Sequence, residues 1–296
     1  MFRWRFIITL VVSPIIILNE MIILLILIMS FFQSGPEVGV VAAVDRDSVV
    51  SAAGIRYIEE NVVNSFSPRK VNEEQFKENL AKFKSAKVKL GAVNVFFPGD
   101  IKLVGDQLNE PLVLGYVDTI MRRCKQAGVR IIVLGSGGSR RLPPGYDSVR
   151  ASKQFIDIVR KMASVAAKYK RIIAIENLNY TETNFVLSLS QAIQYVKAVD
   201  HPNFRLTADV YHMLMENEPA EVIDQAKGIL VHVHIAEKEE RAYPGKRGVD
   251  FVPYFKAMNR IGYKGKIMME ARFKDFDKEV AMGKAYLDKQ LALAAK

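Results

Sequence analysis

The chain has 296 residues, half of them hydrophobic, which is enough for one large core. Its 42 basic and 32 acidic residues give a formal net charge of +10. Much of that charge lies in segments of mixed sign such as NEEQFKENLAKFKSAKVK, a pattern typical of a solvated helix face, and a polyanionic partner is the alternative. The single cysteine, Cys124, excludes an internal disulfide, and we expect a buried, inert thiol.

The N-terminal part of the chain is unusually apolar. Residues 6–32 are almost wholly hydrophobic and follow Arg3 and Arg5, and about 20 apolar residues suffice to span a bilayer. Glu20 falls near the middle of the run, where a carboxylate is costly to insert. Three interpretations stay open: an uncleaved anchor or signal segment, a true start at Met29, or a buried hairpin of hydrophobic helices. Localisation is therefore open between membrane-anchored or exported and cytoplasmic.

After Pro36, short runs rich in Val and Ile alternate with amphipathic segments up to the C-terminus. Such runs are typical of strands covered on both faces. The predicted strands are Val38–Val44, Tyr57–Val63, Gly91–Phe97, Val129–Leu134, Ile172–Ile175, Arg205–Asp209, Leu230–Ile235 and Lys266–Glu270. The predicted helices are Glu73–Lys87, Glu110–Ala127, Val149–Tyr169, Leu187–Val199, Glu218–Lys227, Phe251–Ile261 and Phe276–Ala295.

The repeated strand–helix order requires parallel strands with right-handed crossovers. Eight such units in about 260 residues favour a closed (β/α)₈ TIM barrel, an α/β fold. An open doubly wound sheet is less suitable, because no G-x-G-x-x-G follows the first strand. We predict a hydrophobic signal- or anchor-like segment over residues 1–35 and a catalytic barrel over residues 36–296.

Four consecutive predicted strands end in a potential metal ligand. In a (β/α)₈ barrel the active site lies at the carboxyl ends of the strands, so these side chains point into one mouth. Three carboxylates there would repel one another, and a divalent cation removes that repulsion. Oxygen and imidazole donors suit Mn²⁺, Mg²⁺, Co²⁺ or Zn²⁺, and Mn²⁺ is our first expectation. The predicted ligands are Glu176, Asp209, His234 and Glu270.

Other polar residues near the predicted mouth are candidates for substrate contact. His232 and His234 share one strand face, and we expect His234 to reach the mouth while His232 lies a layer deeper. Glu59 and its neighbour Glu60, at the end of the second strand, and Asn94, on the third, are expected to contact sugar hydroxyls.

The loop GSGGSRR follows the fourth strand. Its free amides and its arginines, Arg140 and Arg141, suggest a phosphate or polyol contact. An ordinary flexible loop with surface-paired arginines is the alternative. After the fifth strand, Asn177 and Asn179 are candidates to orient a ligand carboxylate or to cap the turn.

The blocks IENLNYTETNF, TADVYHM, HVHIAE followed by RAYPG, and IGYKGKIMME resemble the xylose isomerase-like barrel superfamily. Within it, the chain is most similar to sugar phosphate isomerases/epimerases and to ketose 3-epimerases of the tagatose/psicose epimerase type. The likeness continues upstream through NVFFPGDIKLVGD and VLGSGGSRRLPPGY, and so extends from Val38 to the C-terminus.

This resemblance implies roles for individual residues. Glu176, Asp209, His234 and Glu270 match metal ligands, and Glu176 and Glu270 also match the paired acid/base residues. His212 and Glu182 match substrate contacts. Arg241 matches an arginine that holds substrate hydroxyls, but one extra residue separates it from His234 in this chain.

The expected function is therefore a metal-dependent sugar isomerase or epimerase. A metal on the carbonyl and the neighbouring hydroxyl would stabilise an enediolate while two carboxylates move the proton. Alternatives are a keto-sugar or keto-inositol dehydratase, an apurinic-site endonuclease, and a non-catalytic sugar sensor at a membrane. The endonuclease is disfavoured because it resembles a three-metal site rich in histidine, and this chain has four histidines. We expect a small sugar as the partner, no nucleic acid, and possible homo-oligomers.

Overall fold

The computed structural model describes residues 35–296, so the apolar run over residues 6–32 lies outside the described part of the chain. Within residues 35–296, no helix combines the length and hydropathy needed to cross a membrane. The expectation of an anchor or signal segment, and of a boundary after residue 35, stays a prediction.

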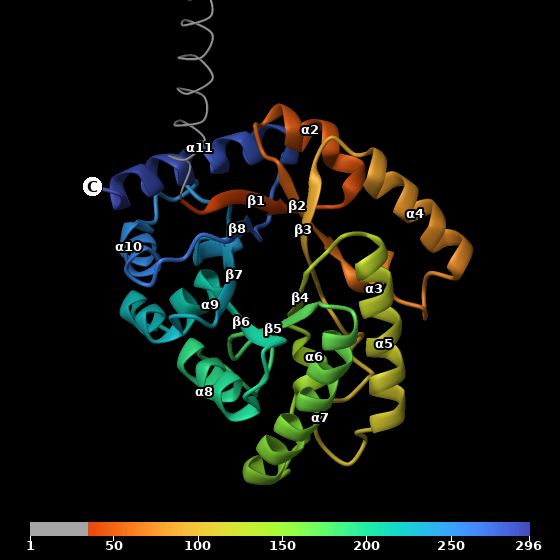
Figure 1. Ribbon diagram of the computed structural model, residues 1–296. Helices are drawn as coiled ribbons and strands as arrows, with labels where there is room; N and C mark the ends of the chain where they lie inside the picture. The colour runs from red at the N-terminus through yellow and green to blue at the C-terminus, as the bar shows by residue number, and fades with distance from the viewer. Residues whose placement is uncertain (1–34) are drawn as a thin grey trace, which may run out of the picture. The chain divides into compact units, whose positions relative to one another are not determined.

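Eight parallel strands close into a barrel in chain order, with β1 paired to β8 (Figure 1). This confirms the predicted (β/α)₈ fold. The strands are β1 (Glu37–Val41), β2 (Tyr57–Asn61), β3 (Lys89–Asn94), β4 (Ile131–Leu134), β5 (Ile172–Glu176), β6 (Phe204–Asp209), β7 (Leu230–Ile235) and β8 (Lys266–Met269).

Helices surround the barrel (Figure 1). They are α2 (Asp47–Ala52), α3 (Val62–Ser65), α4 (Glu73–Ser85), α5 (Glu110–Gln126), α6 (Gly137–Arg140), α7 (Ser148–Lys168), α8 (Leu189–Val199), α9 (Val210–Met215), α10 (Val252–Arg260) and α11 (Phe276–Ala294). Three short 3-10 helices are η1 (Val44–Arg46), η2 (Ala220–Ala226) and η3 (Glu239–Arg241). The segment predicted as a helix over Glu218–Lys227 is therefore the 3-10 helix η2.

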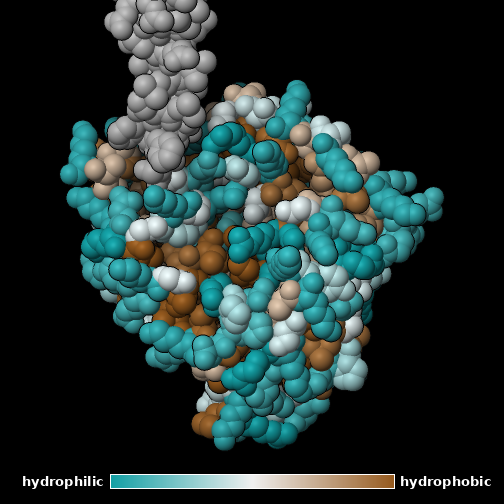
Figure 2. All heavy atoms as spheres, in the orientation of Figure 1, coloured by the Kyte–Doolittle hydropathy of each residue, from teal (hydrophilic) through white to brown (hydrophobic). Residues whose placement is uncertain are grey.

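Helices α4, α5, α7 and α8 begin at side-chain caps, and the outer helices turn apolar faces inward. At α4, the side chain of Asn72 accepts from the amide of Gln75, whose side chain accepts in return from the amide of Asn72. Helix α7 buries Phe155, Ile158 and Met162. On the face shown in Figure 2, hydrophilic side chains cover the outer helices, and hydrophobic side chains gather nearer the middle of the view. Amphipathic patterning thus explains why these segments cover the barrel.

The strand register brings the predicted ligands to one end of the barrel. Glu176 pairs with Thr207 between β5 and β6, and Asp209 pairs with His234 between β6 and β7. Because all strands are parallel, their carboxyl ends form a single rim, and polar side chains there face a common space.

Candidate metal centre and active site

The four predicted ligands form one cluster. Glu176, Asp209, His234 and Glu270 each offer a ligand atom, and these atoms lie within 4.8 Å of one another. His234 Nδ1 lies 2.5 Å from Glu176 Oε1 and 3.2 Å from Glu270 Oε2. The side chain of Glu270 is 23% exposed, whereas that of His234 is fully buried. The cluster therefore reaches solvent at Glu270.

Asp209 is arranged as a ligand. Its Oδ1 caps α9 by accepting from the amides of Tyr211 and His212, at 2.7 and 3.3 Å. Its Oδ2 is buried and accepts no hydrogen bond, although His212 Nε2 and Arg241 Nη2 lie 3.4 and 3.6 Å away, and a buried carboxylate oxygen left this way is costly. Asn177 holds the backbone of Asp209 from both sides, donating to its carbonyl and accepting from its amide. A divalent cation in the cluster fits the free oxygen.

Glu176 lies against the end of β4. A Cβ placed on Gly135 would overlap Glu176 Oε2, so glycine leaves room for the carboxylate in this position, and a larger residue would make its oxygen move. Behind it, Arg140 Nη2 donates to the carbonyl of Glu176 at 2.7 Å. The donor set, the free Asp209 oxygen and this glycine together fit one divalent metal ion.

Below the cluster, Glu59 contacts both strand-seven histidines. Its Oε1 lies 3.0 Å from His234 Nε2, and its Oε2 lies 2.6 Å from His232 Nε2. All three side chains are fully buried. The expectation that His234 reaches the mouth while His232 lies deeper matches this geometry. The expectation that Glu59 contacts substrate is wrong, because both of its oxygens are occupied inside the barrel.

The cluster shifts the pKa values of its members in opposite directions. Burial raises the pKa of Glu176, and burial also raises the pKa of Asp209, to about 6. Burial works against ionised Glu270 as well, but the charges of His234 and Arg241 outweigh it and lower its pKa to about 2. His234 has its pKa raised well above the ordinary value, because the surrounding carboxylates overcome the effect of burial. Carboxyl groups with separated pKa values suit acid/base work.

Arg241 reaches the cluster despite the extra residue before it. Its Nη2 lies 2.5 Å from Glu270 Oε2, and its Nη1 donates to Glu182 Oε1 at 2.9 Å. The guanidinium also stacks on Tyr211, with 4.6 Å from Cζ to the ring centroid. Glu240 and Arg241 both adopt left-handed backbone angles, φ of 61° and 49°, and this turn takes up the added length.

The loop that carries Arg241 is folded around one buried carboxylate. Glu237 is fully buried, and it accepts hydrogen bonds from four backbone amides. These belong to Gly245, Arg247, Gly248 and Val249, at 2.6 to 3.2 Å. Sequence reasoning missed this residue, although an acid followed by a glycine-containing loop was a usable signal.

His212 and Asn94 present unpaired polar atoms near the cluster. Asn94 Nδ2 donates to Glu270 Oε1 at 3.2 Å, which leaves its buried Oδ1 without a partner. His212 Nε2 is also buried and without a partner, 3.8 Å from Glu182 Oε2. Asn94, His212 and Glu182 therefore lie beside the predicted ligands, as expected for candidate substrate contacts.

Each arginine of the β4 loop donates to a backbone carbonyl at the end of β5 or in the loop after it. Arg140 is fully buried, and burial lowers its pKa to about 10. Arg141 Nη2 donates to the carbonyl of Glu182 at 2.8 Å. Arg140 Nε and Nη1 are buried and without a partner, while its Nη2 is bonded to the backbone of Glu176, so the contact of Arg140 with a phosphate or polyol stays a prediction.

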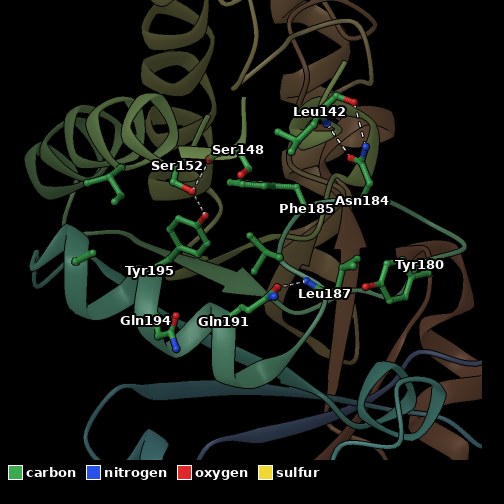
Figure 3. A pocket seen from close by; sticks show the side chains of 13 residues that line it. Leu142, Ser148, Ser152, Tyr180, Asn184, Phe185, Leu187, Gln191, Gln194 and Tyr195 are labelled. Atoms are coloured by element: carbon green, nitrogen blue, oxygen red, sulfur yellow. Dashed lines mark hydrogen bonds between the residues drawn. The ribbon is translucent and has the colours of Figure 1, made fainter. Parts of the chain in front are cut away.

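A separate groove of about 560 Å³ lies between α7, α8 and the loop after β5 (Figure 3). Ser152 and Tyr195 hydrogen-bond across it at 2.8 Å, and Asn184 bonds the backbone of Leu142. None of the four clustered ligands lines this groove.

A family model and individual relatives both match this chain, and they agree on the family. A family model described as "Xylose isomerase-like TIM barrel" matches residues 48–290. The chain is 35% identical over 115 residues to the ketose 3-epimerase of Arthrobacter globiformis, covering 38% of this chain and 39% of that enzyme. It is 27% identical over 185 residues to the 3-dehydro-D-guloside 4-epimerase of Escherichia coli (strain K12), covering 59% of this chain and 70% of that enzyme. The chain thus spans about two-fifths of the first of these relatives.

Solved structures share the fold over most of the chain. A D-psicose 3-epimerase with D-tagatose from Clostridium cellulolyticum H10 superposes with a TM-score of 0.72 at 20% identity, covering 89% of this chain and 97% of that chain. A 3-keto-D-glucoside 4-epimerase from E. coli gives 0.71 at 20% identity, with 86% and 99% covered. Together with the family match, these results confirm the resemblance read from the sequence. The chain belongs to the xylose isomerase-like TIM barrel family.

Proposed function

We propose that this protein is a metal-dependent sugar epimerase that moves a proton at the carbon next to a ketose carbonyl. The observation that carries the proposal is the meeting of two carboxyl groups with opposed pKa shifts, Glu176 and Glu270, at His234 Nδ1. Glu176 ends β5 and Glu270 directly follows β8, three strands apart around the barrel. Relatives named as ketose and 3-dehydro-D-guloside epimerases support the same reaction class.

Glu176, Asp209, His234 and Glu270 would hold the metal ion. A divalent cation there would polarise the carbonyl and adjacent hydroxyl oxygens of a ketose and stabilise the negative charge of an enediolate. Mn²⁺ is our first choice for this mixed oxygen and nitrogen set.

Proton transfer falls to the two carboxyl groups. Glu270 is ionised because of its lowered pKa and is partly exposed, so its carboxylate is available to accept the proton from the carbon. Glu176, with its raised pKa, is suited to return a proton. Arg241 keeps Glu270 ionised and oriented through the 2.5 Å contact to Oε2.

The surrounding polar atoms suit an unphosphorylated sugar. Asn94 Oδ1 and His212 Nε2 are buried and free to bond hydroxyl groups. Arg140 and Arg141 instead donate to the carbonyls of Glu176 and Glu182. We therefore propose a free ketose or keto-glycoside as the substrate class, without a phosphate group.

Proton exchange tests the proposal directly. The full chain, loaded with Mn²⁺, is incubated with a panel of ketoses in heavy water, and NMR detects deuterium at the carbon beside the carbonyl. We expect exchange with epimer formation, lost in Glu176→Gln and in Glu270→Gln. Glu110→Gln, which alters an exposed acid paired with Lys161, is the control.

Three results would contradict the proposal. Exchange at the wild-type rate in both glutamine variants would exclude these residues as the acid/base pair. Loss of water, seen as a lower product mass, would assign a dehydratase. Binding of sugars without exchange across the panel would assign a sugar-binding barrel.

A further inference from the structure

Two residues behind His212 form a short hydrogen-bond chain. Asn179, fully buried in the loop after β5, accepts through Oδ1 from the amide of Thr181 at 2.9 Å and from its hydroxyl at 2.6 Å. A backbone amide can only donate, so the amide group of Asn179 has one possible orientation. Its NH₂ group therefore faces away from Thr181.

That NH₂ group meets His212. Asn179 Nδ2 lies 2.9 Å from His212 Nδ1. An amide NH₂ donates and cannot accept, so His212 Nδ1 must accept with its lone pair and cannot carry a proton. The ring proton of His212 then resides on Nε2, which is buried and makes no hydrogen bond, and which faces two carboxylates, Asp209 Oδ2 at 3.4 Å and Glu182 Oε2 at 3.8 Å.

We propose that Asn179, oriented by the backbone amide of Thr181, acts as a positioning residue that holds His212 in the Nε2–H form, so that it donates a hydrogen bond to a substrate oxygen. The substrate oxygen that meets His212 must accept, as a carbonyl or hydroxyl oxygen does. His212 cannot serve as a base, because its one lone pair is occupied by Asn179. This leaves proton transfer to Glu176 and Glu270. The role toward substrate rests on the proposed function, whereas the position of the ring proton does not.

The ring proton can be located by NMR without any substrate. Long-range ¹H–¹⁵N spectra distinguish protonated from unprotonated ring nitrogens, and the chain has four histidines to resolve. His212→Gln assigns the signals. In the wild type we expect an unprotonated Nδ1 and a protonated Nε2 at neutral pH. In Asn179→Asp, a carboxylate oxygen takes the place of the NH₂ group, and we expect Nδ1 to become protonated.

Matched variants separate this effect from general damage. Asn184→Asp makes the same change in the same loop, where Asn184 bonds Leu142, and it should leave the His212 signals unchanged. Thr181→Val removes only the hydroxyl donor and keeps the backbone amide, so the Nε2–H form should persist. On an accepted ketose, we expect Asn179→Asp to raise KM roughly tenfold, the effect of one hydrogen bond lost in binding.

A wild-type His212 protonated on Nδ1, or unchanged His212 signals in Asn179→Asp, would overturn the inference. If no ketose exchanges deuterium but His212 is protonated on Nε2, the proposed function fails while the positioning by Asn179 stands. If a ketose exchanges deuterium but His212 is protonated on Nδ1, the proposed function stands while the positioning by Asn179 fails.

Discussion

Glu59 and His234 meet inside the barrel, with Glu59 Oε1 3.0 Å from His234 Nε2, one layer below the ligand cluster. The contact turns Nδ1 of the same ring toward Glu176 and Glu270. A carboxylate that accepts from the far nitrogen of a ligand histidine orients the ring and increases its basicity. Since Glu59 also accepts from His232, two buried imidazoles are fixed by one side chain.

Replacing Glu59 by glutamine should weaken metal binding without removing a ligand. The amide keeps the shape but loses the charge that holds His234, and such changes typically cost about 10- to 100-fold in metal affinity. Isothermal titration with Mn²⁺ measures the effect. Glu60→Gln, next to it on β2 but bonded to the amides of Val44 and Asn61, is the control. Equal Mn²⁺ affinity in Glu59→Gln and the wild type would show that Glu59 has no such role.

Asp209→Asn should remove metal binding and activity together. Asp209 supplies the buried oxygen that lacks a partner, and an amide in its place would present a neutral, weaker donor. We expect Mn²⁺ affinity to fall by at least about 100-fold, more than for the supporting residue Glu59. Circular dichroism checks the fold. Asp224→Asn, which alters an exposed ion pair with Arg260, should bind metal normally.

The stabilisation by metal should grow with pH. The pKa of Asp209, raised to about 6 by burial, means that its protonated form favours folding at low pH and that this contribution is lost as pH rises through about 6. The pKa of His234 is also raised, because the surrounding carboxylates overcome the effect of burial. The stability that its protonated form contributes is therefore likewise lost as the pH rises. Glu59 and Glu270, both with a pKa of about 2, stay ionised across this range.

A metal ion replaces those protons, so it competes poorly below about pH 6. We expect the rise in Tm caused by Mn²⁺ to be small near pH 5 and large near pH 8, measured by calorimetry on the same preparation. A rise in Tm that is the same at both pH values would contradict the shifts assigned to Asp209 and His234.

Arg241→Lys should lower kcat/KM while metal affinity stays within a few-fold of the wild type. Lysine keeps the charge, but it cannot reach Glu270 and Glu182 together while stacking on Tyr211. Loss of a charge-assisted hydrogen bond is worth about 1.5–3 kcal/mol, or roughly 10- to 100-fold in rate. Steady-state kinetics and Mn²⁺ titration of the same sample give both values. A variant with unchanged kcat/KM would remove Arg241 from the substrate site.

The sequence predicted the strands well because buried parallel strands have a simple apolar signature. Leu230–Ile235 agrees at both ends, and most other strands differ by a few residues at their termini. Short helices that lie between the strands and the long helices were harder to predict from the sequence. Helix α2, over Asp47–Ala52, was not predicted, since six residues are too few to show a helical period. The predicted burial of Cys124 is confirmed.

The sequence predicted the site residues that lie at the ends of strands. It did not predict the contacts of residues whose role depends on how deep their side chains lie in the barrel. Glu176, Asp209 and His234 lie at strand ends, and parallel pairing brings them together. Glu59 was expected at the end of its strand, but it is the middle residue of β2, and its buried side chain lies in a deeper layer of the barrel. Arg140 looked like a free loop cation, and only the packing of α6 shows it to be buried behind Glu176.

Gly135 is not itself a ligand, but its missing side chain leaves the space that the carboxylate of Glu176 occupies. The addition of one methyl group at this position would displace the carboxylate and leave the remaining barrel contacts intact. A glycine-to-alanine change at position 135 would therefore act on the carboxylate end of Glu176, a member of the ligand cluster, and not on the backbone of the barrel.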